Sequence, residues 1–154
     1  MMGRFMEREI SLADYPSRAT DKLRYGDTDR QGHINNAVFS TLLETGRVEV
    51  LHDPAHPLTP PGSGFVIVRL ALDFRRELHW PGTVSICTRV AAIGRSSVTF
   101  EQAIFQDERC AATAETVVVL MDEATRRSRP LPQETIDRLS VHARTAADDG
   151  AVAS

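Results

Sequence analysis

The chain has 154 residues, of which 42% are hydrophobic and 25% are charged, and its formal net charge is −3. This length suits a single domain, and the composition argues against wholesale disorder and against a membrane-spanning protein. A net negative charge provides no basic field for wrapping nucleic acid, so a small soluble partner is expected instead. The N-terminal region carries acidic residues and no apolar run, unlike a signal or transit peptide. We therefore expect a cytoplasmic protein without membrane insertion.

The chain contains two cysteines, Cys87 and Cys110. Two are too few for a disulfide framework, and both lie in apolar, strand-like surroundings. Neither has a histidine nearby in the sequence, so buried, reduced thiols packed in the core are predicted in place of nucleophiles.

An amphipathic helix is the strongest predicted element. Residues 1–19 show no sustained period and are predicted to form an N-terminal arm, followed by an extended segment over residues 20–26. After a polar turn, either Asn35 or Asn36 can cap a helix that runs to about His52, because Asn is a preferred N-cap residue. A glycine within the helix costs about 1 kcal/mol relative to alanine, so Gly46 indicates close packing on a sheet. The predicted buried face comprises Phe39, Leu42, Leu43, Gly46 and Val50.

Beyond a loop rich in proline and glycine, the hydrophobic pattern changes to period two, which is typical of strands. The first strand places Val66, Val68, Leu70, Leu72 and Phe74 on one face. Short links imply an antiparallel meander, and one long central helix against a curved antiparallel sheet of about five strands gives an α+β fold. The four long strands are predicted over residues 65–74, 83–93, 97–106 and 109–121.

The sheet is predicted to need a partner. One helix cannot cover it, and residues 109–121 are expected to form a long edge strand, which proteins usually cover by pairing. A homo-oligomer, either a dimer or a dimer of dimers, is therefore expected. The predicted organisation is an arm over residues 1–19, one domain over residues 20–132, and a C-terminal short helix with a flexible tail over residues 133–154.

The turn between Leu23 and the helix concentrates groups that could perform chemistry. It contains two carboxylates, an imidazole and two amides beside the N–H groups of a helix start, an arrangement suited to polarising an electronegative atom. The structural alternatives are that Asp27 and Asp29 only brace the turn and that His33 is a capping or core histidine. A calcium loop fits poorly, because Val38 stands where a bidentate glutamate is required.

The run Tyr25-Gly26-Asp27-Thr28-Asp29, followed by Gly32-His33-Ile34-Asn35-Asn36 and then by Phe39 and Glu44 with Arg47, resembles the hotdog-fold acyl-CoA thioesterases of the 4-hydroxybenzoyl-CoA thioesterase-like group. The similarity extends through the strand over residues 65–74, Trp80-Pro81-Gly82 and the hairpin at Gly94-Arg95-Ser96-Ser97. The resemblance implies a long central helix wrapped by a sheet, dimers that share one continuous sheet, and active sites at the dimer interface.

The resemblance also implies roles for individual residues. Asp29 matches the carboxylate that acts as nucleophile or general base, and Asn36 falls where relatives offer a backbone N–H to the thioester carbonyl. His33 matches a histidine of the plant acyl-ACP thioesterases. These enzymes resemble this chain in the same run and are proposed to use that histidine in catalysis. Gln31 stands where the plant enzymes have a catalytic asparagine, and Asn36 stands where a bacterial branch has a histidine.

Further residues are predicted to contact the substrate. Asn35, Phe39 and Glu44 lie along the start of the helix, and Glu44 has the alternative role of holding a partner strand. Arginine suits phosphate because its fork donates several hydrogen bonds. Outside the helix, the residues predicted to contact the phosphates of CoA are Arg75, Arg76 and Arg95. Ser96 lies in the hairpin that the pantetheine arm is predicted to pass.

The predicted function is hydrolysis of acyl-CoA or acyl-ACP thioesters to free acid and thiol, without metal or organic cofactor. A helix N-terminus can serve as an oxyanion hole, and a carboxylate beside it can attack the carbonyl or activate water. The alternatives are a non-catalytic acyl-CoA binding or sensing module, a hotdog hydratase or dehydratase, and a purely structural dimer. The residues do not define the acyl group.

Overall fold

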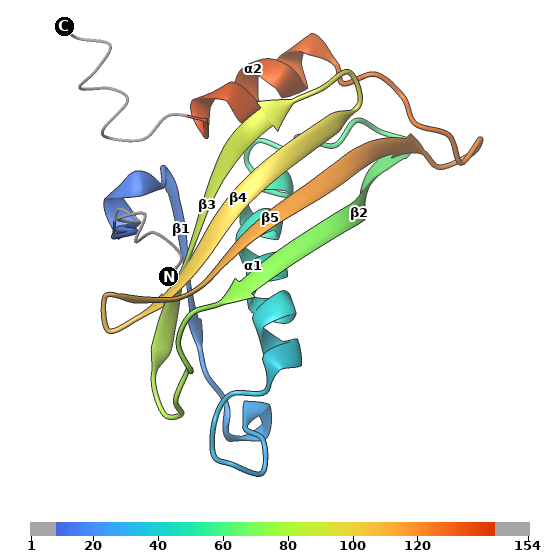
Figure 1. Cartoon of the computed structure of the whole chain (residues 1–154). Coiled ribbons are helices and arrows are strands. Elements are labelled where there is room, and N and C mark those ends of the chain that lie inside the picture. The colour runs from blue at the N-terminus through green and yellow to red at the C-terminus, as the bar shows by residue number, and fades with distance from the viewer. Residues whose placement is uncertain (1–8, 144–154) are drawn as a thin grey trace, which may run out of the picture.

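The five strands form one antiparallel sheet in the order β1-β3-β4-β5-β2, with one long helix against it (Figure 1). The computed structural model describes residues 9–143. The strands are β1 (Ser17–Lys22), β2 (Ser63–Phe74), β3 (Thr83–Ile93), β4 (Ser97–Gln106) and β5 (Arg109–Asp122). The helices are α1 (Asn36–Leu51) and α2 (Gln133–Val141), with 3-10 turns at Leu12–Asp14 and Tyr25–Asp27. The predicted α+β architecture of one central helix and five strands is confirmed.

Helix α1 begins and ends close to the predicted positions. Asn35 is the N-cap: its side-chain oxygen accepts a hydrogen bond from Ala37 N at 3.0 Å. The predicted apolar face is buried, and Arg47 and Leu51 are buried with it. This face packs mainly on β1, β3 and β4, so α1 leaves the side of the sheet that carries β2 less covered.

Gly46 lets α1 approach the sheet closely. A Cβ atom at this position would lie 2.6 Å from Ile86 Cγ2 and 2.9 Å from Gln102 Nε2. The close approach allows Gln102 Nε2 to donate to the Leu43 carbonyl at 2.9 Å, and Arg47 Nη1 donates to Gln102 Oε1 at 3.1 Å. Helix and sheet are therefore joined by buried hydrogen bonds as well as by apolar contact.

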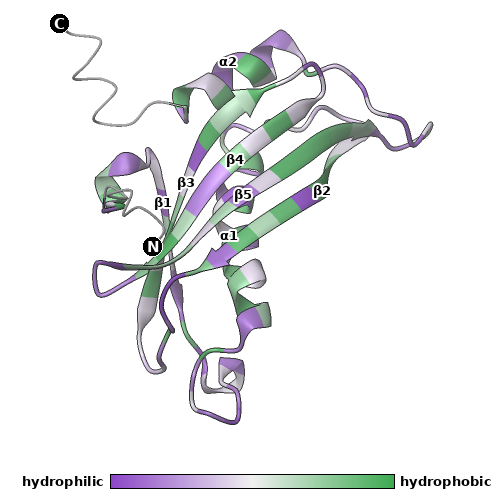
Figure 2. Ribbon diagram, in the orientation of Figure 1, coloured by the Kyte–Doolittle hydropathy of each residue, from purple (hydrophilic) through white to green (hydrophobic). Residues whose placement is uncertain are grey.

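The sheet order corrects the prediction that residues 109–121 form an edge strand. Strand β5 lies inside the sheet between β4 and β2, and the edges are β1 and β2. Only β3, β4 and β5 form the predicted meander, because β2 pairs with β5 instead of with the next strand in the chain. Figure 2 shows hydrophobic stretches on both β2 and β5, where these strands run side by side.

A β-bulge interrupts β2 and changes which of its side chains share a face. Ile67 pairs with Val118 and Arg69 pairs with Val117, so an extra residue is accommodated at Val68. Leu70, Leu72 and Phe74 share one face as predicted, but Val66 does not, because the bulge shifts the alternation. Several large apolar side chains of this edge strand remain exposed: Ile67 (51%), Val68 (59%), Leu70 (36%) and Phe74 (51%).

Residues 9–22 contain regular structure and apolar contacts within and beyond the predicted arm. Strand β1 begins at Ser17, within the predicted arm, and ends at Lys22, before the predicted end of the extended segment. Ahead of it, Ile10, Leu12 and Tyr15 pack against a buried cluster of Cys87, Ala103, Phe105 and Cys110. Both cysteines are free and buried, as predicted, and burial raises the pKa of Cys87 to about 11.

The predicted C-terminal helix is present as α2, which lies over the end of β3 (Figure 1). The predicted tail beyond residue 143 and the first eight residues of the arm lie outside the described residues. Among the helices of residues 9–143, none has the length and apolar character needed to span a bilayer.

Candidate active site

The polar turn ahead of α1 is closed by backbone hydrogen bonds. Asp29 N donates to the His33 carbonyl at 2.7 Å, and Gly32 N donates to the Asp29 carbonyl at 3.2 Å. Gly32 has a φ of +82°, a conformation that glycine adopts without steric cost. Ile34 N then donates to the Leu78 carbonyl at 3.0 Å, which ties the turn to the link between β2 and β3.

The two acids of the turn have different environments. Asp27 is buried and accepts hydrogen bonds from Arg24 N at 2.9 Å and Arg24 Nη2 at 3.0 Å. Burial alone would raise the pKa of Asp27, but these bonds and the charge of Arg24 lower it below its usual value. Asp27 therefore braces the turn, as the structural alternative predicted for it.

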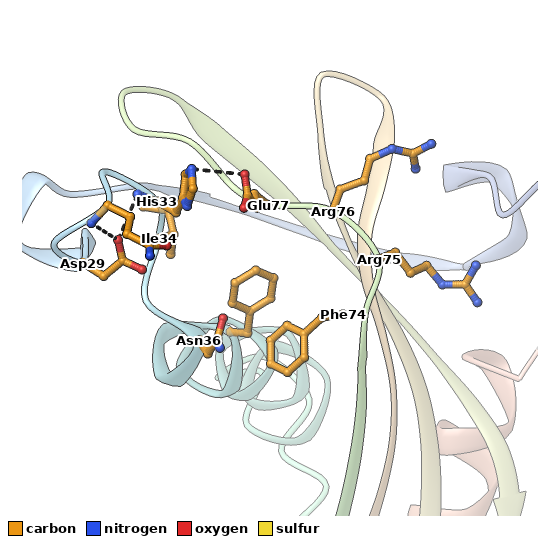
Figure 3. A pocket seen from close by; sticks show the side chains of 10 residues that line it. Asp29, His33, Ile34, Asn36, Phe74, Arg75, Arg76 and Glu77 are labelled. Carbon is orange, nitrogen blue, oxygen red and sulfur yellow. Dashed lines mark hydrogen bonds and ion pairs between the residues drawn. The ribbon is translucent and has the colours of Figure 1, made fainter.

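Asp29 is exposed and faces a pocket. Its Oδ1 accepts hydrogen bonds from Gln31 N at 2.8 Å and His33 N at 3.2 Å (Figure 3). Within residues 9–143, no group donates a hydrogen bond to its Oδ2. Two main-chain donors thus fix the carboxylate through one oxygen and leave the other available for chemistry.

His33 is directed away from Asp29. Its Nε2 lies 3.1 Å from Glu77 Oε2, and Figure 3 shows the ring turned toward the link between β2 and β3. His33 bonds Asp29 through its backbone N–H and carbonyl, and not through its ring. Main-chain N–H groups, and not the imidazole, therefore orient the Asp29 carboxylate.

The start of α1 forms the floor of the pocket. Ala37 N and Val38 N are bonded to Asn35, whereas Asn36 N donates to no group within the described part of the chain. Phe39 and Phe74 meet edge to face with ring centroids 5.0 Å apart. The pocket has a volume of about 380 Å³, and its lining residues are Asp29, Gln31, His33, Ile34, Asn36, Phe39, Phe74, Arg75, Arg76 and Glu77.

The structure brings together most, but not all, of the predicted site residues. Asp29, His33, Asn36 and Phe39 line the pocket, while Asn35 is used as the helix cap. Glu44 is exposed farther along α1 and does not line the pocket.

Three predicted arginines take two different positions. Arg75 and Arg76 form the rim of the pocket, and Figure 3 shows both side chains extending away from Asp29. Arg76 Nη1 donates to the Cys110 carbonyl at 3.1 Å. Arg95 and Ser96 lie in the hairpin between β3 and β4, at the other end of the sheet. Phe74 pairs with Ala112 of β5, and Ser97 pairs with Val119 of β5. The two ends are therefore seven residues apart along β5, or about 23 Å.

Sequence reasoning missed Gln31, Ile34, Phe74 and Glu77 as pocket residues. Gln31 and Ile34 belong to the turn already singled out, so their position in it was the available signal. Glu77 follows the end of β2 by three residues and has no periodic pattern that would mark it. Within residues 9–143, no group of three or more His, Cys, Asp or Glu side chains is placed to hold a metal ion.

Comparison with known proteins identifies the family. The model of the thioesterase-like superfamily matches residues 23–139, which is most of the chain. The chain belongs to the thioesterase-like superfamily. The predicted resemblance to hotdog-fold thioesterases is thereby confirmed.

Three proteins that are similar to this chain are named as thioesterases or as hydrolases of CoA thioesters. A 1,4-dihydroxy-2-naphthoyl-CoA hydrolase from Synechococcus elongatus is 24% identical over 137 residues, which cover 86% of this chain and 99% of the relative. The acyl-CoA thioester hydrolase YbgC of Escherichia coli is 24% identical over 119 residues, covering 75% and 89%. A Thermus thermophilus thioesterase solved with coenzyme A and zinc is 28% identical, with a TM-score of 0.72 and coverage of 81% and 98%.

Proposed function

We propose that this member of the thioesterase-like superfamily hydrolyses acyl-CoA thioesters to a free acid and CoA in the pocket at the start of α1. The observation that carries the proposal is the pairing of Asp29, held through Oδ1 alone, with the open N–H of Asn36 in the same pocket. The N–H would polarise the thioester carbonyl as an oxyanion hole, where one donor is typically worth about 10²–10³ in rate. Asp29 would attack the carbonyl carbon or activate a water molecule.

The relatives support a CoA ester as the substrate. Two of them are named as hydrolases of CoA thioesters, and the Thermus thermophilus structure contains coenzyme A. In this chain Arg75 and Arg76 at the rim of the pocket would meet the phosphates of the carrier. An acyl-ACP ester would present the same pantetheine arm, so both carriers belong in the test.

Arg95 would reach the same substrate from a second subunit. If two copies pair antiparallel through β2, the partner's β3–β4 hairpin lies at the same end of the joint sheet as Phe74 of this chain, with the partner's β2 and β5 between them. Arg95 and Ser96 would then approach the pocket in trans, although within one chain they are distant from it.

Dimerisation through β2 is the expected assembly. This strand is an edge with an exposed apolar surface, and pairing would cover both its hydrogen-bonding groups and its side chains. We expect light scattering to give a dimer or a dimer of dimers. Val68→Lys should raise the dissociation constant of the β2 interface by about tenfold or more, or ~1.4 kcal/mol, because a lysine would be buried there.

Val141→Lys is the matched control, because Val141 is 69% exposed and lies on α2, which packs mainly on β3. It should leave the dissociation constant unchanged. A wild-type protein that is a stable and active monomer at micromolar concentration would contradict this assembly.

The function is tested by following thiol release from a panel of acyl-CoA and acyl-ACP esters. We expect turnover that persists after treatment with a chelator, since the predicted chemistry uses only protein groups. Activity that is lost on chelation and restored only by a divalent metal would refute the cofactor-free mechanism. Tight binding of acyl-CoA without thiol release would instead indicate an acyl-CoA binding or sensing module.

A further inference from the structure

The contact between His33 and Glu77 joins two segments that are distant in the sequence. His33 belongs to the turn before α1, and Glu77 belongs to the link between β2 and β3. Their side chains meet at 3.1 Å, from Nε2 to Oε2, and both line the pocket (Figure 3). Glu77 is 60% exposed at the side chain, so the contact contributes more to orientation than to stability.

The main chain holds both partners in place. His33 and His79 form an antiparallel β-bridge, which places the turn beside the link. Gln106 on β4 fixes the link through both backbone groups of His79: its Oε1 accepts from His79 N at 3.0 Å, and its Nε2 donates to the His79 carbonyl at 2.8 Å. The position of Glu77 relative to His33 is therefore determined by the fold.

His33 is the better partner for Glu77 of the two nearby histidines. His79 Nε2 lies 3.9 Å from the same carboxylate oxygen, which is beyond hydrogen-bond distance. The two rings meet edge to face with centroids 5.4 Å apart, so His79 packs against His33. Glu77 and His79 thus both contact the His33 ring.

The chemistry of the pair favours one position for the imidazole proton. An ionised carboxylate only accepts hydrogen bonds, so Glu77 Oε2 at 3.1 Å favours a proton on His33 Nε2. In a neutral imidazole the other nitrogen, Nδ1, then carries the lone pair and is the proton acceptor. Because His33 lines the pocket, this acceptor belongs to a side chain at the proposed reaction site.

We propose that Glu77 is a positioning residue that holds the His33 imidazole with its proton on Nε2, so that Nδ1 acts as the general base for water. This inference rests on the proposed thioesterase function. In the hydrolytic step, water forms the new bond to the carbonyl carbon and its proton passes to His33 Nδ1. With His33 as the base for water, Asp29 is the nucleophile: it has already displaced the thiolate to form an anhydride, and the bond from the carbonyl carbon to the Asp29 oxygen now breaks. The imidazolium then returns the proton to the thiolate or to solvent.

Glu77→Ala and Glu77→Gln test the proposal, with Glu123→Gln as the control carboxylate, exposed beyond the end of β5. Long-range proton–nitrogen NMR of the ligand-free protein reports which ring nitrogen of His33 is protonated. We expect Nε2 protonation in the wild type and in Glu77→Gln, whose amide oxygen still accepts, and a mixture of tautomers in Glu77→Ala.

The kcat values of the variants should follow the same ranking as their ring signals, with Glu77→Ala the most affected. General-base catalysis is typically worth about 10²–10⁴ in rate, and loss of its positioning should lower kcat of Glu77→Ala by about tenfold or more with little change in KM. Glu77→Gln should recover part of this loss, and Glu123→Gln should match the wild type. A kcat loss shared by the control would also count against a specific role of Glu77.

Two results would overturn the proposal in distinguishable ways. If Glu77→Ala leaves both the ring signals and kcat unchanged while Asp29→Asn is inactive, the positioning role is wrong and the proposed function stands. If the wild-type protein releases no thiol from any ester, the proposed function fails, and the catalytic role of the pair fails with it even where the ring signals respond to Glu77→Ala.

Discussion

Asp29→Asn is expected to lower kcat for the best ester of the panel by about two orders of magnitude or more, with little change in KM. The physical reason is that asparagine keeps the shape and the Oδ1 acceptor that Gln31 N and His33 N require, but loses the charge of the oxygen left available. Asparagine also tolerates turn conformations, so the fold should be retained. Steady-state kinetics together with circular dichroism provide the measurement.

Asp27→Asn is the matched control in the same turn. Asp27 is buried against Arg24 and does not line the pocket, so its replacement should cost stability, about 1–2 kcal/mol, with a smaller effect on kcat. A folded, dimeric Asp29→Asn protein with a turnover number near that of the wild type would show that Asp29 is only a turn residue.

Gly46→Ala is expected to lower the free energy of unfolding by about 2–3 kcal/mol. On a solvated helix this substitution would stabilise by about 1 kcal/mol, so the expected sign is opposite to helix propensity. Here the new methyl group would meet Ile86 and the amide of Gln102 at less than contact distance, and the helix would have to move away from the sheet.

Urea denaturation at one fixed protein concentration would measure this loss, because the stability of the expected dimer would depend on protomer concentration. Glu49→Ala on the exposed side of α1 is the control and should change the free energy of unfolding by less than about 0.5 kcal/mol. Equal or greater stability of Gly46→Ala would mean that the helix does not depend on this close approach.

Local patterns predicted the elements well and their arrangement less well. The helix followed from its apolar period and from an Asn cap, and both signals lie within a few residues of the structure they specify. The order of strands did not follow, because period two is the same for a central strand and an edge strand. Pairing of β2 with β5 joins residues that are about 40 to 60 positions apart, and no local signal reports it.

The candidate site shows the same division. Asp29, His33 and Asn36 were predicted from a polar turn together with its resemblance to hotdog-fold thioesterases, and the structure places all three around one pocket. Glu77 was missed because its relation to His33 exists only through the β-bridge between the turn and the link after β2. The hairpin with Arg95 was grouped with Arg75 by residue type, although the antiparallel sheet places the two at opposite ends.

The position of β2 at the edge of the sheet has a consequence for folding. The hairpins β3–β4 and β4–β5 close through short turns, whereas β2 reaches β5 only after a long loop has closed, which costs more entropy. We expect β2 to dock late, and newly made chains to expose its apolar residues until a partner arrives. Refolding yield should therefore pass through a maximum with protein concentration, limited by slow pairing of subunits in dilute solution and by aggregation in concentrated solution.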